Sequence, residues 1–335
     1  MPKEAFSASG KAATDPALRK SADEPSIFTI FSTASLCLLP WRGKRGDEGL
    51  LPVRIKSTSP RVGPLARNAV RFAEQGRDVR VSEQNLPLTV REINVKTVLS
   101  KSGIPRVDYC INPYVGCGHG CRYCYATFMK RFTGHREPWG SFVDVKGNGP
   151  EVLHKQIKRA HKGKVMISSV TDPYQPTEEK YQLTRQCLEI LLEHQFPVGI
   201  LTKSPLVLRD VDLIKEFKEI EVGITVTTDD EAVRGIFEPQ APSIDTRLNT
   251  LKTLYEKGVD TYAFIGPLLP MNPEALSERI NPYVQSVLID RMNYVSKTLM
   301  IYKRMNLKRW LDDSFLGEVI DSLQRGFAGK EVTIC

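Results

Sequence analysis

Short apolar segments alternate with amphipathic segments of helical length from about residue 88 onward, and this alternation limits the fold more than any other feature. Segments that predict strands lie at 108–112, 164–169, 197–202, 221–227, 261–265 and 286–290. Segments that predict helices lie at 150–160, 178–194, 206–217, 243–257 and 273–281. Regular strand–helix units predict a parallel sheet with helices packed outside it. We therefore expect residues 88–335 to form one α/β domain, a partial (β/α)6 TIM-like barrel with parallel strands.

Residues 1–87 have a different composition, rich in Ser, Ala, Pro, Gly and Arg, with no sustained period of 2 or 3.6. We interpret them as a low-complexity, largely disordered N-terminal extension. One apolar stretch, at 27–41, is too short for a membrane span, and Asp23 and Glu24 precede it where a secretory signal would have positive charge. We favour an apolar patch in a loose tail over a targeting segment, and expect no membrane association.

The net charge of +8 is unevenly distributed along the chain. Residues 1–100 contain 16 Lys and Arg against 10 Asp and Glu, whereas residues 101–335 contain 31 against 29. The total charge therefore gives only weak support for nucleic-acid binding by the strand–helix region. A local basic groove would be compatible with this sum, but the sum does not reveal one.

Three cysteines, Cys117, Cys121 and Cys124, have the spacing Cys-x3-Cys-x2-Cys. Thiolates are the ligands of iron–sulfur clusters, and the glycines at 116, 118 and 120 allow the sharp turns that would bring three sulfurs together. Three close ligands would leave one iron of a 4Fe-4S cluster open to a substrate or cofactor. The spacing therefore predicts a cluster that takes part in chemistry.

Other roles for these cysteines remain open. Cys110 could supply a fourth thiolate, giving a structural zinc site or a closed cluster, and His119 could also contribute. Structural zinc sites usually contain two separated Cys-x2-Cys pairs, and a second pair is absent from the sequence. The remaining cysteines, Cys37, Cys187 and Cys335, have no framework spacing, which argues against a disulfide scaffold and for a reducing cytoplasm.

Polar residues follow the ends of the predicted strands. They are Thr171, Asp172, Tyr174, Gln175, Thr202, Lys203, Ser204, Thr227, Thr228, Asp229, Asp230, Asp290, Arg291 and Asn293. Ligands of parallel α/β folds bind at the carboxyl ends of the strands, so we expect these residues to meet the cysteine loop at one edge.

Several of these residues have a structural alternative. Asp172, Asp229 and Asp230 could each cap a helix or turn instead of binding a ligand. Lys203 ends an apolar strand, so its ammonium should point to the edge of the sheet, where we expect a carboxylate partner.

The cysteine loop, with Tyr123 directly before the last cysteine, resembles the signature of radical S-adenosylmethionine (radical SAM) enzymes. The blocks around it are similar to the spore photoproduct lyase-like branch, whose members are often labelled DNA-repair photolyases. These blocks are INPYVGCGHGCRYCYATFMKRFTGH, VTDPYQPTEEKYQLTR, LTKSPLVLRD, VTTDDE and IGPLLP, and the resemblance covers roughly residues 90–330.

This resemblance implies that Cys117, Cys121 and Cys124 hold a 4Fe-4S cluster, whose open iron binds S-adenosyl-L-methionine. Reductive cleavage would give a 5′-deoxyadenosyl radical that takes hydrogen from an unknown substrate, for which a nucleic acid is a weakly supported candidate. A low-potential flavodoxin or ferredoxin would supply the electron. The resemblance also implies contacts to the cofactor's adenine, amino, carboxylate and ribose groups from Tyr123, Thr171, Asp172, Lys203 and Thr227.

The chain departs from the lyase at the residue that returns hydrogen. The lyase uses a cysteine near the end of the second strand, where this chain reads SSVTDPYQ. Tyr174, Tyr125 or Tyr114 could relay hydrogen instead, although each is also a good packing residue. The catalytic residues are unknown, with Tyr174, Asp290 and Arg291 as candidates.

Two further alternatives concern function and the loop after the cysteines. The chain could be a non-catalytic, cysteine-ligated, metal-stabilised nucleic-acid-binding module. Trp139, in the long connection after the cysteine loop, could belong to a lid or to a packed surface loop.

Overall fold

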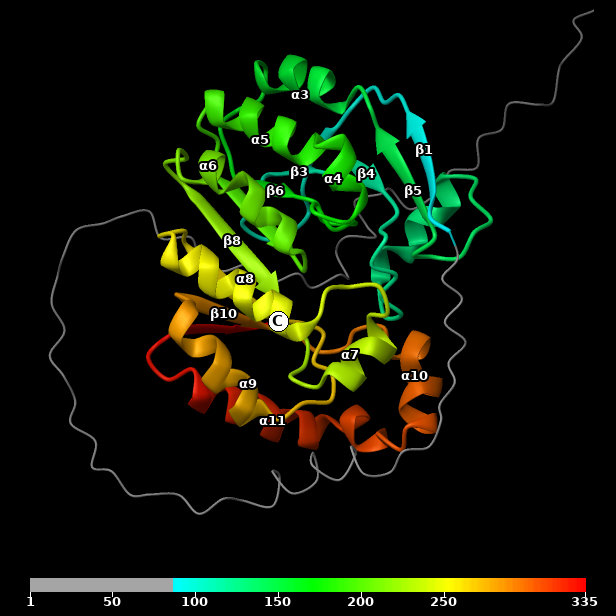
Figure 1. The fold of residues 1–335 in the computed structure, drawn as a ribbon, viewed down its shortest axis with the longest axis vertical. Helices are drawn as coiled ribbons and strands as arrows, with labels where there is room; N and C mark the ends of the chain where they lie inside the picture. Colours follow the sequence, from blue (N-terminus) through cyan, green and yellow to red (C-terminus); the bar gives the residue numbers. More distant parts are fainter. Residues whose placement is uncertain (1–86) are drawn as a thin grey trace, which may run out of the picture.

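Residues 87–335 are described by the structure, a computed structural model with a mixed α/β fold (Figure 1). The predicted extension at 1–87, apart from its last residue, and the apolar stretch at 27–41 lie outside the described residues. The strands form an eight-stranded sheet with the order β11-β10-β9-β8-β7-β6-β3-β2 and a three-stranded sheet with the order β1-β5-β4. No helix in residues 87–335 has the length and apolar character needed to cross a membrane.

The eight-stranded sheet contains all six predicted strands. From β3 to β11 every neighbouring pair is parallel, and only β2 pairs antiparallel, with β3. Its strands are β2 (Leu99–Lys101), β3 (Tyr109–Ile111), β6 (Val165–Ile167), β7 (Val198–Thr202), β8 (Ile220–Thr225), β9 (Thr261–Ile265), β10 (Ser286–Ile289) and β11 (Glu331–Ile334). The predicted parallel α/β arrangement is therefore confirmed.

Helices follow the strands and cover the outer face of the sheet, where α3, α5, α8, α9 and α11 succeed one another (Figure 1). The helices are α3 (Gly149–Ile157), α4 (Thr177–Tyr181), α5 (Leu183–Glu193), α6 (Val211–Ile214), α7 (Glu231–Phe237), α8 (Ile244–Glu256), α9 (Pro273–Ile280), α10 (Val295–Arg304) and α11 (Asp313–Gly326). Short 3-10 helices are η2 (Tyr125–Phe132), η3 (Pro205–Asp210), η4 (Asn281–Tyr283) and η5 (Lys308–Leu311). Leu188, Leu251 and Leu323 are fully buried in the main core, with Ile200 and Ile224 of the sheet. Apolar helix faces thus pack on a sheet that is buried on both sides.

Two predicted helices are broken in the structure. The segment 178–194 forms α4 and α5, separated by Gln182 in the left-handed region with φ 52°. The Glu178 carboxylate accepts hydrogen bonds from the backbone N–H groups of Thr184 and Arg185 at 3.0 and 3.3 Å, so it caps the restarted helix. The segment 206–217 forms only η3 and one turn of α6, and Asp210, at the junction of the two, belongs to a buried ion-pair network.

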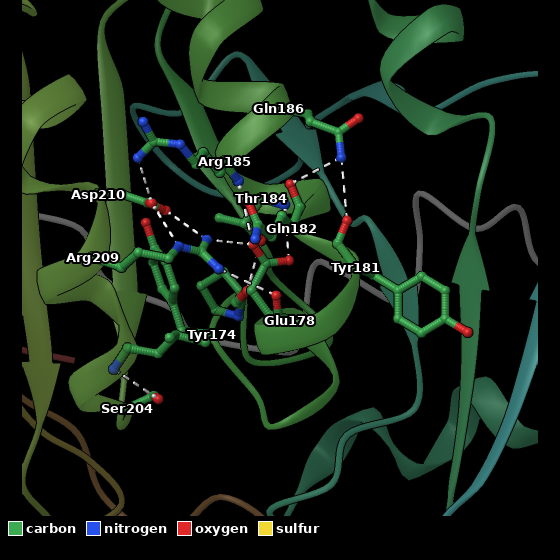
Figure 2. Close-up of polar contacts among 12 residues, drawn as sticks. Tyr174, Glu178, Tyr181, Gln182, Thr184, Arg185, Gln186, Ser204, Arg209 and Asp210 are labelled. Atoms are coloured by element: carbon green, nitrogen blue, oxygen red, sulfur yellow. Dashed lines mark hydrogen bonds and ion pairs between the residues drawn. The ribbon is translucent and has the colours of Figure 1, made fainter.

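That ion-pair network joins two of the motif blocks (Figure 2). Arg209 reaches Glu178 at 2.7 Å and Asp210 at 2.8 Å, and Arg185 reaches Asp210 at 2.9 Å. Both carboxylates are fully buried, so each depends on its arginine partners for compensation. The Tyr114 hydroxyl also donates to Glu178. The network thereby connects the strand before the cysteine loop to the segments that follow β6 and β7.

The three-stranded sheet was not predicted from the sequence. It consists of β1 (Thr89–Ile93), β4 (Tyr114–Val115) and β5 (Phe142–Lys146), with β1 parallel and β4 antiparallel to β5. Trp139 packs edge-on against Phe142, with ring centroids 5.9 Å apart and planes at 85°. This contact supports the interpretation of the connection as a packed loop. Since β4 ends at Val115, the small sheet fixes where the cysteine loop begins.

Candidate active site

A cavity of about 180 Å³ lies at the carboxyl ends of β6, β7, β9 and β10, where the polar residues were expected. The cysteine loop forms one wall of it. The polar and sulfur-bearing residues that line it include Cys117, His119, Cys121, Cys124, Ser168, Ser169, Thr171, Asp172, Lys203, Asp290, Arg291 and Asn293. The structure therefore brings together the three cysteines and most of the predicted site residues. Tyr123 also lines the cavity, whereas Tyr174 and Thr227 do not.

The cysteine loop turns sharply where it crosses the loop before β5. Gly120 and Gly140 both have positive φ, +61° and +98°. A Cβ atom on Gly140 would lie 2.6 Å from the Cα of Gly120, closer than real Cβ contacts come. The two backbones therefore touch, and glycine is required at this crossing.

Substituting Gly140→Ala is expected to lower the free energy of unfolding by about 2 to 4 kcal/mol, from a disfavoured φ and a backbone clash together. Gly134→Ala is the matched control, because Gly134 also has positive φ (+72°) but no atom lies within 4 Å of its added Cβ. In that control the free energy of unfolding should fall by only about 1 kcal/mol. Urea denaturation measures both, and equal losses would show that the crossing is not tight.

Side chains that follow β6 hold the cysteine loop in place. The backbone N–H of Gly118 donates to Gln175 Oε1 at 2.8 Å, and the Thr171 hydroxyl donates to the Gly116 carbonyl at 2.6 Å. Gln175 Nε2 donates in turn to Thr171 Oγ1 at 2.9 Å. Thr171 and Gln175 therefore anchor the loop through its backbone and leave the thiols unused.

The three thiols are shielded from solvent to different degrees. Cys117 and Cys121 are buried, and Cys124 is half-buried. Burial raises the pKa of all three thiols, that of Cys121 to about 12. Thiols in this setting stay protonated until a metal binds and displaces the proton. No group of three or more His, Cys, Asp or Glu side chains within residues 87–335 is arranged to hold a metal ion. A four-iron cluster binds each thiolate to a different iron, so its ligands need not converge on one point.

Asp172 is fully engaged with its own loop and with the end of β7. Its carboxylate accepts from the Tyr174 backbone at 2.9 Å, the Thr202 hydroxyl at 2.6 Å and the Lys203 backbone at 2.9 Å. Burial alone would raise the pKa of Asp172, but nearby His119 and these donors lower it to about 2. Asp172 is therefore an ionised turn-capping residue that also faces the cavity.

His119 lies between the first two cysteines and is 2% exposed. Its Nε2 is 3.3 Å from Asp172 Oδ2, and neither ring nitrogen has a hydrogen-bond partner within the described part of the chain. Buried polar atoms are normally paired. Since Nε2 still lies beside the Asp172 carboxylate, Nδ1 is the nitrogen that fits a cavity wall ready to receive a polar ligand.

The carboxylate partner expected for Lys203 is Glu238, which was not identified from the sequence. Lys203 Nζ lies 3.9 Å from Glu238 Oε1. Glu238 also accepts from the Tyr123 hydroxyl, from Arg247 Nη2 and, at 3.1 Å, from the Thr227 hydroxyl. Burial would raise the pKa of Glu238, but Arg247 and Lys203 lower it to about 2. One ionised carboxylate thus fixes three of the residues assigned to the cofactor.

The three tyrosines considered as hydrogen relays lie in different places. Tyr174 is in the main core and Tyr114 is buried in the small-sheet core. Tyr125 lines the cavity, and its hydroxyl donates to the Ser169 carbonyl.

The structure also places the two aspartates considered as helix caps and the cysteine considered as a fourth metal ligand. Asp230 caps α7 through the backbone N–H groups of Ala232 and Val233, at 2.8 and 3.2 Å, and Asp229 accepts from the Asn272 backbone at 2.8 Å. Cys110 lies on β3 in a separate apolar cluster, and it does not line the cavity.

Asp290 and Arg291 follow β10 at the cavity. Asp290 accepts from Asn293 Nδ2 at 3.2 Å, and burial raises the pKa of its carboxyl to about 6. Arg291 is half-exposed and pairs with Asp313 at 3.2 Å. Asp290 is therefore a carboxyl group that can change protonation near neutral pH.

Asp290→Asn is expected to stabilise the fold at about pH 7.5 by about 2 to 3 kcal/mol. A raised pKa means that the folded state holds the proton more tightly, so the wild type loses stability as the pH rises from about 4 through about 6. Asparagine carries no charge and keeps an oxygen that accepts from Asn293. The gain, measured by urea denaturation, should therefore vanish at about pH 4. A gain that is independent of pH would contradict the assignment.

Comparison with known proteins assigns the chain to a class. The profile of the Radical SAM superfamily matches residues 111–281, and the chain belongs to this superfamily. An uncharacterized protein of Methanocaldococcus jannaschii is 35% identical over 258 residues, 72% of this chain and 95% of that protein. The radical SAM Nalpha-GlyT isomerase of Pseudomonas phage M6 is 25% identical over 160 residues, 47% of this chain and 32% of that protein.

Among solved structures, the fold is similar to spore photoproduct lyase complexed with dinucleoside spore photoproduct. The TM-score is 0.56 at 15% identity, and the match covers 81% of this chain and 95% of the lyase chain. At this identity the similarity concerns the fold. The resemblance to spore photoproduct lyase-like radical SAM proteins is confirmed at that level.

Proposed function

We propose that the chain is a radical SAM enzyme whose Cys117, Cys121 and Cys124 hold a 4Fe-4S cluster beside a site for S-adenosyl-L-methionine. The observation that carries the proposal is that these three thiols, in the superfamily spacing, line one cavity with Asp172 and Lys203. When bound, the cluster and S-adenosyl-L-methionine would supply the electron and the 5′-deoxyadenosyl radical that abstracts hydrogen from a substrate. We further propose that residues 88–335 form one domain and that its sheet is a partial (β/α)6 barrel.

The cavity residues would bind and orient the methionine part of the cofactor. The Lys203 ammonium, held between Glu238 and the Tyr123 ring at 5.9 Å from the ring centroid, would pair with the carboxylate. Thr171 and Asp172 would lie near the amino group, with the loop contacts of both residues keeping them rigid. The Tyr123 backbone would meet the adenine. Thr227 does not line the cavity, so it would act on the part of the site that holds the ribose indirectly, through its hydrogen bond to Glu238.

The substrate would occupy the side of the cavity formed by Asp290 and Arg291, which we propose as the catalytic candidates. Asp290 would hold or release a proton there, since its pKa is about 6. Tyr174 lies in the core, so Tyr125 is the better placed hydrogen relay. A nucleic-acid component is our candidate substrate, by analogy with the dinucleoside in the lyase complex. A low-potential flavodoxin or ferredoxin and a reducing cytoplasm would suit a cysteine-held cluster.

The alternative of a metal-stabilised nucleic-acid-binding module has less support. It relies on Cys110 as a fourth ligand, and Cys110 does not line the cavity that the three other thiols share.

The decisive experiment is anaerobic reconstitution of the full chain with iron and sulfide, followed by dithionite and S-adenosyl-L-methionine. Chromatography should detect 5′-deoxyadenosine. Its complete absence from protein that carries a full cluster would disprove the proposed function, and stoichiometric zinc in the purified protein would favour the binding module.

A further inference from the structure

Two segments that border the cavity contain ten basic and no acidic residues. They are residues 121–136 and 291–311, which we call the basic rim. Its charged residues are Arg122, Lys130, Arg131, Arg136, Arg291, Lys297, Lys303, Arg304, Lys308 and Arg309. The rest of 101–335 therefore holds 21 basic against 29 acidic residues. The near-neutral sum conceals a strong separation of charge.

The two segments of the basic rim are joined at the cysteine loop. Lys297 of α10 donates from Nζ to the Cys124 carbonyl at 2.6 Å and also to the Thr127 hydroxyl. Tyr125 of η2 stacks on Tyr294, with ring centroids 6.2 Å apart and planes at 17°. Both segments also supply residues to the cavity wall. The rim is therefore one continuous surface beside the mouth of the cavity.

Most charges of the rim are not neutralised by ion pairs. Arg291 pairs with Asp313 at 3.2 Å and Arg309 with Glu318 at 3.7 Å. Among residues 87–335, no carboxylate forms an ion pair with the other eight basic side chains. A predominantly basic surface of this kind attracts and orients an oppositely charged partner.

We propose that the basic rim is the docking surface for a small acidic electron carrier of the flavodoxin type, an inference that rests on the proposed function. Cys124 is the least buried of the three cysteines, and its carbonyl accepts a hydrogen bond from the exposed Lys297. A carrier on the rim would therefore sit over the side of the cluster nearest solvent. One electron passes from the reduced carrier to the oxidised cluster, and no bond is made or broken.

The rim also carries apolar contacts suited to a transient interface. Phe132 is 58% exposed and Met300 is 56% exposed, one on each segment. Transient redox complexes bury small areas and combine a few apolar contacts with complementary charge. Exposed apolar side chains among unpaired cations fit such a partner.

A single-stranded nucleic acid fits the rim less well, because bases need free aromatic faces on which to stack. The Tyr125 ring stacks on Phe128, with centroids 6.5 Å apart, and also on Tyr294. The Arg131 guanidinium covers the Phe132 ring at 4.8 Å from its centroid. Phe132 is therefore the single largely exposed aromatic side chain in these two segments, whereas a strand of bases stacks on several.

The test is stopped-flow reduction of the reconstituted full-length protein by a reduced acidic flavodoxin. In the variant Arg131→Glu/Lys303→Glu/Arg304→Glu the second-order rate constant should fall about tenfold or more at low ionic strength. The difference should disappear at high salt, where screening removes the steering. Reduction by dithionite and the 5′-deoxyadenosine formed with dithionite should be unchanged, which separates this proposal from the proposed function.

The matched control reverses three charges at the C-terminal end of α3, with Lys155 in the helix and Lys158 and Arg159 directly after it. This helix lies at the top of Figure 1, while α10 lies at the lower right. Lys155→Glu/Lys158→Glu/Arg159→Glu should leave the flavodoxin rate within about twofold of wild type, since its charges are remote from the cluster. Equal effects of the two triple variants would overturn the proposal. An unchanged flavodoxin rate in the rim variant would also overturn it, and loss of oligonucleotide binding in that variant would then assign the rim to nucleic acid. Should the rim variant fail to fold, Arg131→Glu and Lys303→Glu are tested singly.

Discussion

Alanine in place of Cys117, Cys121 or Cys124 should abolish both iron–sulfur loading and 5′-deoxyadenosine formation. Each thiolate would hold a different iron, so two remaining ligands cannot retain the cluster. Iron and sulfide analysis after anaerobic reconstitution measures the first effect, and chromatography of the S-adenosyl-L-methionine reaction measures the second. Both should fall to background in each single variant.

Cys110→Ala and Cys335→Ala are the matched controls for these variants. Neither residue lines the cavity, so both variants should load iron and sulfide like the wild type. Loss of metal from Cys110→Ala to the same extent as from Cys117→Ala would contradict the three-cysteine assignment. It would support a closed site with four thiolates.

Glu238→Ala should lower the free energy of unfolding by about 3 to 5 kcal/mol, the usual cost of leaving a buried charge without its partner. Arg247 has no exposed surface and would lose its carboxylate, and Tyr123, Thr227 and Lys203 would lose a shared neighbour. Urea denaturation of the protein before reconstitution measures the change. Because Tyr123 and Lys203 both line the cavity, S-adenosyl-L-methionine should also bind more weakly to the reconstituted variant.

Two further variants test whether the buried Glu238–Arg247 pair causes this loss of stability. Glu256→Ala removes an exposed carboxylate that lies 3.8 Å from Lys252 on α8, and it should change stability by less than about 1 kcal/mol. Glu238→Gln combined with Arg247→Met should recover part of the loss, since the fully buried Arg247 charge is removed together with its partner. A loss in Glu238→Ala no larger than in Glu256→Ala would contradict the role given to this carboxylate.

The central sheet was predictable because its strands are buried on both faces and therefore appear in the sequence as continuous apolar segments, as in Val198–Thr202. The small sheet was not predicted. One edge strand, Thr89–Ile93, is largely exposed, and the other edge strand, Tyr114–Val115, has only two residues. Strands of this kind depend on pairing with distant segments, which local patterns do not reveal. The break at Gln182 has the same origin, because a buried carboxylate, Glu178, restarts the helix.

The candidate site likewise contains residues that the sequence predicts and one that it does not. The cysteines and Lys203 were identified because their chemistry is apparent from spacing and from position at a strand end. Glu238 follows α7 in the segment FEPQAP, which has no motif. It meets Lys203 and Tyr123 through the packing of α7 against the cysteine loop. A lysine can indicate that a carboxylate partner is needed, but tertiary structure decides which carboxylate it is.

The anchoring of the cysteine loop has a consequence for how the protein matures. Gln175 holds the loop at Gly118, and Glu238 holds it at Tyr123, in both cases without using sulfur. Zinc fingers, by contrast, acquire their shape only when the metal arrives. Folding of the chain and insertion of the proposed cluster can therefore be separate events in this protein. An assembly factor would meet a finished scaffold, and its task would be delivery.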